Sequence, residues 1–229
     1  MIFDTGYMLI AGIVMLVSWA VSATLKSKFR NYSMTPISSG MSGAEVAANM
    51  LDAYGIRGVR ITCVEGTLTD HYNPTDYTIN LSPDVYYGRN AAAAAVAAHE
   101  TGHAVQHAKA YSFLQLRSAI VPAVSFVSPW IGWVLIAGLF MLESAPWVML
   151  IGIAMFALTT LFSFVTLPVE FDASRRALEW IKQSRVVNSQ EYAMSKDALW
   201  WAAMTYVVAA LGSLATLMYY IMLFLGRRD

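Results

Sequence analysis

The run "TGYMLIAGIVMLVSWAVSATL", residues 5–25, contains no Asp, Glu, Lys, Arg or His. Three further runs share this property, and they cover residues 118–142, 144–169 and 198–225. Each run is longer than the ~20 apolar residues that a helix needs to cross a hydrocarbon layer about 30 Å thick. The sequence therefore predicts a mainly α membrane protein with four transmembrane helices.

The four runs divide the chain of 229 residues into five segments. In order these are a first span at 1–25, a polar segment at 26–117, a hairpin of two spans at 118–169, a second polar segment at 170–197, and a fourth span with its tail at 198–229. The first run is expected to be a retained helix and not a cleaved signal peptide, because "MIFD" before it holds an acid and no Lys or Arg. Since little more than Glu143 to Pro146 joins the second and third spans, these two should form a tight hairpin whose open ends lie on the same side.

The distribution of basic residues predicts the orientation of the chain. Of the 15 Lys and Arg residues, 13 lie in the two polar segments, and the other two, Arg227 and Arg228, are at the C-terminus. Because cytoplasmic loops of membrane proteins carry an excess of Lys and Arg, both polar segments should face the cytoplasm. Both termini should then face outward, although the C-terminal arginine pair opposes this orientation.

Charge and cysteine content exclude several classes of protein. The formal net charge is zero, which gives no general attraction to nucleic acid. The single cysteine, Cys63, rules out an intrachain disulfide and any metal cluster built from several cysteines. A metal transporter should carry ionisable residues inside its spans, and the four runs have no Asp, Glu, Lys, Arg or His.

The first polar segment is predicted to be a small α+β unit. Ser42 and Glu45 match a capping box at the start of a helix that Gly55 ends, and Asn90 can cap a later helix that begins with alanines. The expected elements are a helix at 42–56, a strand at 59–64, a hairpin-like turn at 70–76 feeding a strand at 77–81, a short helix from Pro83 and a longer helix over 91–110.

The longer helix carries the residues with recognisable chemistry. His99 and His103 are four residues apart, so both imidazoles project from one face of the helix. Two imidazoles at this spacing can bind one zinc ion, and Glu100 can then reach a water on the metal as general base. The string "HETGH" therefore matches the H-E-x-x-H signature of zinc metalloproteases.

Two other histidines lie near this motif. His107 is eight residues from His99, about 12 Å along a helix, too far for both to bind one ion, so a packing or supporting role is expected. The extended metzincin motif is also absent, because Lys109 stands where its third histidine would be. His71 either lines the cleft and contacts substrate or forms hydrogen bonds within its own turn, and the turn role is favoured.

A catalytic zinc site needs a third protein ligand and one open position. Glu170 and Asp172 follow the third span directly, and the hairpin should bring them towards the histidines. Both acids stay candidates on this argument. The second polar segment should extend the helix of the third span, with a kink or a fresh start at Pro168.

The stretches "AAVAAHETGHAVQHAKAY" (94–111) and "PVEFDASRRALEWI" (168–181) resemble the YugP-like neutral zinc metallopeptidases. These are bacterial membrane enzymes distantly similar to the HtpX and CAAX-processing proteases. The resemblance implies a gluzincin with one Zn²⁺ per chain, in which His99, His103 and Glu170 are the ligands and Glu100 is the base. The HtpX-like pattern E-x-x-x-D has Ser174 in place of its aspartate here, and Asp172 is the alternative supporting acid.

The expected function is that of a membrane-embedded zinc endopeptidase with its catalytic part in the cytoplasm of a bacterial cell. Its partners would be the lipid bilayer and polypeptide substrates, such as membrane or misfolded proteins in quality control. The strand at 77–81 is expected to hold an extended substrate by edge pairing. A tyrosine, Arg175 and His71 are candidates for stabilising the oxyanion. The alternative is a non-catalytic membrane scaffold with a structural zinc, which would need a fourth protein ligand.

Overall fold

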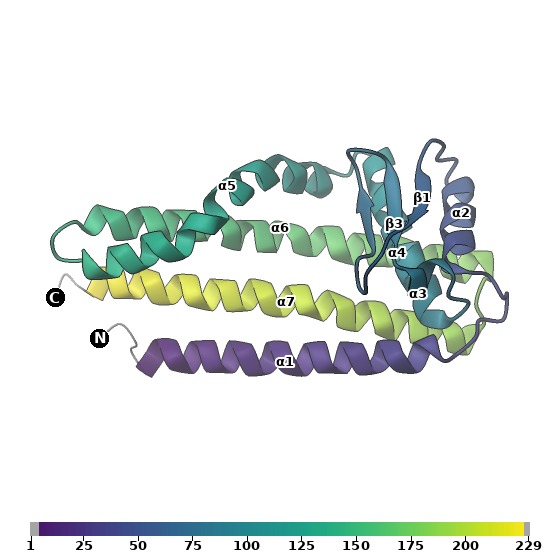
Figure 1. Cartoon of the computed structure of the whole chain (residues 1–229), viewed down its shortest axis with the longest axis horizontal. Coiled ribbons are helices and arrows are strands. Elements are labelled where there is room, and N and C mark those ends of the chain that lie inside the picture. Colours follow the sequence, from purple (N-terminus) through teal and green to yellow (C-terminus); the bar gives the residue numbers. More distant parts are fainter. Residues whose placement is uncertain (1–4, 227–229) are drawn as a thin grey trace. The chain divides into compact units, whose positions relative to one another are not determined.

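The computed structural model describes residues 5–226, which form seven helices and three strands (Figure 1). The helices are α1 (Thr5–Ser33), α2 (Gly43–Ala53), α3 (Pro83–Tyr86), α4 (Ala91–Ala108), α5 (Ser112–Phe140), α6 (Pro146–Ser184) and α7 (Ser189–Leu225). The strands are β1 (Arg60–Cys63), β2 (His71–Asn73) and β3 (Thr78–Leu81). The chain divides into two compact units, whose described residues are 5–20, 116–167 and 205–226 in the first and 21–115 and 168–204 in the second.

The first unit contains the apolar parts of four helices. Among the described residues, α1, α5, α6 and α7 are each long and apolar enough to cross a membrane, which confirms the four predicted spans. Large side chains such as Phe126 and Trp133 are more than 70% exposed, as suits a surface that faces lipid. Inside the unit, the Thr160 and Ser213 hydroxyls form a hydrogen bond of 2.6 Å.

Helix α6 continues without interruption through Pro168 to Ser184. The expectation of a fresh start at Pro168 is therefore wrong. A proline inside a helix removes one backbone donor, and contacts on both sides can maintain the helix across it. Beyond Pro168 these contacts come from a stripe of fully buried residues at four-residue spacing, which are Val169, Ala173, Ala177 and Ile181.

The second unit contains a three-stranded sheet with the order β1-β3-β2. Strand β1 pairs with β3 in parallel, and β2 pairs with β3 in antiparallel register. The predicted strands correspond to β1 and β3, whereas β2 lies in the stretch that was expected to be only a turn. Because β2 has three residues and is followed by Pro74, it lacks the alternating pattern by which a strand is recognised.

Helix α4 runs through the core of the second unit, beside the sheet (Figure 1). The Asn90 side chain accepts a hydrogen bond from the Ala93 N–H, and the capping box between Ser42 and Glu45 starts α2, both as predicted. The alanines at 91–95, 97 and 98 are buried. Their small side chains allow α2, the sheet and the polar part of α6 to approach α4, and this packing fixes the direction in which the "HETGH" turn of α4 points.

Candidate metal centre

The structure brings His99 and His103 of α4 together with Glu170 of α6. The two imidazole rings lie 4.8 Å apart between their centroids and are nearly perpendicular. The Glu170 Oε2 atom lies 3.3 Å from His99 Nε2 and 3.7 Å from His103 Nε2. One donor atom from each residue lies within 4.8 Å of the others, so within residues 5–226 these three side chains form a group that could hold a metal ion.

The donor set and its spacing fit zinc. Zinc binds imidazole nitrogen and carboxylate oxygen at about 2.0–2.2 Å, so two ligands of a tetrahedral ion lie about 3.4 Å apart. The two nitrogen–oxygen distances in this group, 3.3 and 3.7 Å, are close to that value. Three protein donors leave one position for water or substrate, which is the arrangement of catalytic zinc sites.

A glycine allows the two ligand-bearing helices to approach. A Cβ atom placed on Gly102 would lie 2.6 Å from the backbone oxygen of Ala173 and 3.2 Å from its Cα. Gly102 is next to His103, and Ala173 is three residues after Glu170. The absence of a side chain at Gly102 thus permits the contact between α4 and α6 that places the carboxylate beside the imidazoles.

The centre is withdrawn from solvent. The side chain of Glu170 is 3% exposed and that of His103 is 11% exposed. Burial lowers the pKa of His103, but the hydrogen bond and charge of Glu170, together with the charge of Glu100, raise it by more, so the net shift is upward. Without metal, His103 and Glu170 thus favour an ion pair, and a bound cation takes the place of the shared proton.

Glu100 is buried next to the ligands and is oriented by β2. Its Oε2 atom accepts a hydrogen bond of 3.0 Å from the backbone N–H of Tyr72. The phenol of Tyr72 is 2.7 Å from His107 Nδ1, and burial raises the pKa of Tyr72 to about 12. Tyr72 therefore stays protonated at physiological pH. It connects the edge strand β2 to α4 twice, through its backbone N–H to Glu100 and through its phenol to His107.

Each imidazole of the group has a second polar partner on its Nδ1 atom. His99 Nδ1 is 3.0 Å from Ser174 Oγ, and His103 Nδ1 is 3.0 Å from Gln106 Oε1. Ser174 of α6 occupies the place of the aspartate in the E-x-x-x-D pattern and contacts His99 of α4. Asp172 points to Gln106, so it reaches the centre through another side chain.

The other candidates from the sequence lie outside the three-residue group. His107 contacts Tyr72 and stacks on Tyr77, with ring centroids 5.3 Å apart. His71 Nδ1 is 2.7 Å from the Thr69 carbonyl, within its own turn. Arg175 pairs with Asp172 and Glu179. The sequence argument missed Gln106 and Tyr72; the spacing of three residues between His103 and Gln106, one helical turn, is the signal that could have found the first.

Four apolar helices and a largely buried group of two histidines and a glutamate define a membrane protein with a candidate metal centre. Over residues 7–225 the sequence matches the family described as "Putative neutral zinc metallopeptidase", and the chain belongs to this family. It is 45% identical over 205 residues, 90% of each chain, to "Putative membrane protease YugP" of Bacillus subtilis (strain 168). No solved structure matches it.

These comparisons confirm the resemblance inferred from the sequence. Together with the four apolar helices, they identify a multi-pass membrane protein of a zinc metallopeptidase family.

Proposed function

We propose that this protein is a membrane-embedded zinc endopeptidase of the H-E-x-x-H type. His99, His103 and Glu170 hold one zinc ion per chain, and Glu100 is the general base. The observation that carries the proposal is the largely buried group of three donors, with the carboxylate of Glu100 next to the two histidines on α4. A structural zinc site is closed by a fourth protein ligand. Glu100 would have no role in such a site, because it is not one of the metal ligands.

Zinc held by His99, His103 and Glu170 would supply Lewis acidity, which would polarise the scissile carbonyl and lower the pKa of a water molecule. Glu100 removes the proton from the attacking water and then delivers it to the departing amine. The hydrogen bond from the Tyr72 N–H orients the Glu100 carboxylate, so this base does not have to be ordered when substrate arrives. Arg175, His71 and Tyr72 are the candidates for contacts with the developing oxyanion.

We expect an extended polypeptide to bind along the edge of the sheet. Strand β3 cannot take this role, because it lies between β1 and β2, so the expectation of edge pairing at residues 77–81 is wrong. Strand β2 is at the edge of the sheet, and its Tyr72 contacts Glu100. Pairing at β2 would place a peptide backbone beside the base, in the manner of β-strand addition.

A groove beside the centre suits an apolar substrate side chain. It has a volume of about 370 Å³ and an apolar surface that includes Phe171, Leu178 and Trp200, next to Ser174, which contacts His99. The charged residues Arg175, Glu179, Lys182 and Lys196 also line it. Apolar lining with a few polar groups is typical of binding pockets. The groove supports substrates with apolar side chains, such as membrane or misfolded proteins, and a role in membrane-protein quality control.

The distribution of charge supports a catalytic part in the cytoplasm. The second unit, which contains the metal centre, also contains 12 of the 15 Lys and Arg residues. In bacterial membrane proteins such an excess marks the cytoplasmic side of the inner membrane.

Substitution of Glu100 by Gln tests the proposal. The variant should retain about one zinc per chain, because Glu100 is not a ligand, and it should lose peptidase activity. Native membranes that contain the variant should accumulate uncleaved proteins bound to it, which would identify the substrate class. If wild type and variant show the same bound proteins and neither cleaves peptide, the scaffold alternative is favoured.

A further inference from the structure

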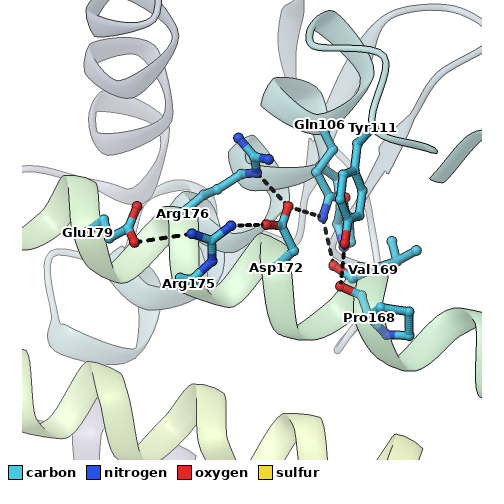
Figure 2. A network of polar contacts seen from close by, with 9 residues as sticks. Gln106, Tyr111, Pro168, Val169, Asp172, Arg175, Arg176 and Glu179 are labelled. Atoms are coloured by element: carbon cyan, nitrogen blue, oxygen red, sulfur yellow. Dashed lines mark hydrogen bonds and ion pairs between the residues drawn. The ribbon is translucent and has the colours of Figure 1, made fainter. Parts of the chain in front are cut away.

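Gln106 connects the two helices that carry the metal-binding group (Figure 2). Its side chain is fully buried. Its Nε2 atom donates hydrogen bonds to the Val169 carbonyl oxygen at 2.8 Å and to Asp172 Oδ2 at 2.9 Å. Its Oε1 atom lies 3.0 Å from His103 Nδ1. Val169 and Asp172 flank Glu170 in the sequence, so Gln106 is attached to α6 on both sides of the candidate ligand.

The chemistry of these contacts determines which imidazole nitrogen carries a proton. A backbone carbonyl and an ionised carboxylate can only accept hydrogen bonds, so the end of Gln106 that faces them must be the NH₂ group. The other end is then the carbonyl oxygen, which can only accept. His103 must therefore donate from Nδ1, and when the imidazole is neutral its Nε2 atom has the lone pair that can bind the metal.

We propose that Gln106 is a positioning residue that holds His103 in the tautomer and ring orientation required for metal binding through Nε2. This inference rests on the proposed function of the centre and assigns a role to a side chain outside the three donors. Metal-binding histidines commonly donate their other N–H to a carboxylate or a carbonyl. Here the neutral amide of Gln106 takes that place, and the carboxylate of Asp172 is hydrogen-bonded to the amide and not to His103.

Asp172 is in turn held by two arginines. Arg176 Nε lies 2.5 Å from Asp172 Oδ2, and Arg175 pairs with the other carboxylate oxygen. The Arg176 guanidinium also lies over the ring of Tyr111 at 5.8 Å. The Val169 carbonyl oxygen can only accept, so it orients the NH₂ group of Gln106 towards α6 independently of Asp172. Figure 2 shows this network on one side of α6.

The partner of His99 does not impose the same choice. Ser174 Oγ is 3.0 Å from His99 Nδ1, but a hydroxyl can donate or accept. Ser174 can therefore bond to either tautomer of His99. The variant Ser174→Ala removes a contact of equal length from the neighbouring ligand, and it is the matched control for Gln106.

The first test identifies the protonated nitrogen in the wild-type protein. The chain has four histidines, so ¹⁵N-histidine labelling gives few ring signals, and single substitutions can assign them. In the zinc-loaded protein, His103 should carry its proton on Nδ1, with slow exchange against water because this proton is buried and hydrogen-bonded. Gln106→Met should shift this resonance or speed its exchange, whereas Ser174→Ala should leave it in place. A wild-type His103 protonated on Nε2, or an unchanged resonance in folded Gln106→Met, would overturn the proposal.

The second test measures zinc affinity by competition with a chelator. Gln106→Met should weaken zinc binding by about 10–100-fold, the usual cost of losing a partner of a metal ligand. Asp172→Asn should weaken it in the wild-type background but have no further effect in Gln106→Met, because Asp172 acts through Gln106. Additive losses in this double-mutant cycle would overturn the proposal.

Both tests use zinc alone and no peptide, so their outcome is separate from that of the proposed function. A protein that shows the Nδ1 proton and the non-additive cycle but cleaves no peptide supports the role of Gln106 and contradicts the peptidase. An active peptidase with additive losses contradicts the role of Gln106 alone.

Discussion

Gly102, at the fourth position of "HETGH", is where one added methyl group is expected to weaken the metal centre. In Gly102→Ala the new Cβ would lie 2.6 Å from the Ala173 backbone oxygen. Ordinary contacts between carbon and oxygen are about 3.3 Å, so α4 and α6 would have to separate by about 0.7 Å. A metal site tolerates errors of only about 0.2 Å in its bond lengths. The distances from Glu170 to His99 and His103 should therefore become too long for all three to bind one ion well.

The effect on stability should be smaller than the effect on zinc. Overpacking costs about 1–3 kcal/mol, but alanine gains about 1 kcal/mol over glycine inside a helix. The net loss in free energy of unfolding should then be about 0–2 kcal/mol, which leaves the metal-free protein folded. Because each 1.4 kcal/mol is a factor of ten in an equilibrium constant, strain retained in the zinc-bound state should reduce affinity by about 10-fold or more.

The assay is chelator competition for zinc by the purified protein, with the unfolding midpoint of the metal-free protein measured in parallel. Gly132→Ala in α5 is the matched control, since a Cβ there would meet nothing within 4 Å. It should leave zinc affinity unchanged. If Gly102→Ala binds zinc within about two-fold of wild type, the close approach of α4 and α6 does not hold the centre together, and this reasoning fails.

Three further predictions concern the ligands, the orientation and the pH dependence. Glu170→Gln should reduce zinc affinity by more than ~100-fold and Asp172→Asn by less, since losing a ligand costs more than losing a supporting residue; the reverse order in the chelator assay would exclude Glu170 as ligand. The single cysteine, Cys63, is exposed on β1, so a membrane-impermeant maleimide should label it only in permeabilised cells, and labelling of intact cells would reverse the predicted orientation. Burial lowers the pKa of His103, but the hydrogen bond and charge of Glu170 and the charge of Glu100 raise it by more, to a value above the ordinary 6.5. Zinc must therefore displace a proton that His103 binds at higher pH than an ordinary histidine does. Zinc affinity should thus fall with decreasing pH from above pH 6.5, and an affinity that stays flat between about pH 8 and 6 would contradict this.

The membrane spans, the capped helices and the "HETGH" motif could be predicted from the sequence because each depends on residues close together in the chain. A helix crosses a bilayer if about 20 consecutive residues lack charge, and the four runs meet that condition without reference to any neighbour. Likewise, His99 and His103 share a face because of helical geometry alone.

Tertiary packing decided the features that depend on contacts between distant segments. Strand β2 exists because β3 supplies its hydrogen-bonding partners, although its three residues carry no pattern of their own. The same holds for the edge of the sheet next to Glu100, which is formed by β2 and not by the more strand-like residues 77–81.

The choice between Glu170 and Asp172 shows the difference most clearly. The two acids closely follow the same span, and this position left both open, although the family resemblance favoured Glu170. Two residues correspond to about 200° around a helix, so only one of them can face the histidines. The stripe from Val169 to Ile181 that packs into the core sets the rotation of α6, which turns Glu170 towards His99 and His103 and Asp172 towards Gln106 and the arginines. The stripe itself is a local pattern, but the partner against which it packs, and therefore the group that Glu170 faces, is decided only by the tertiary structure.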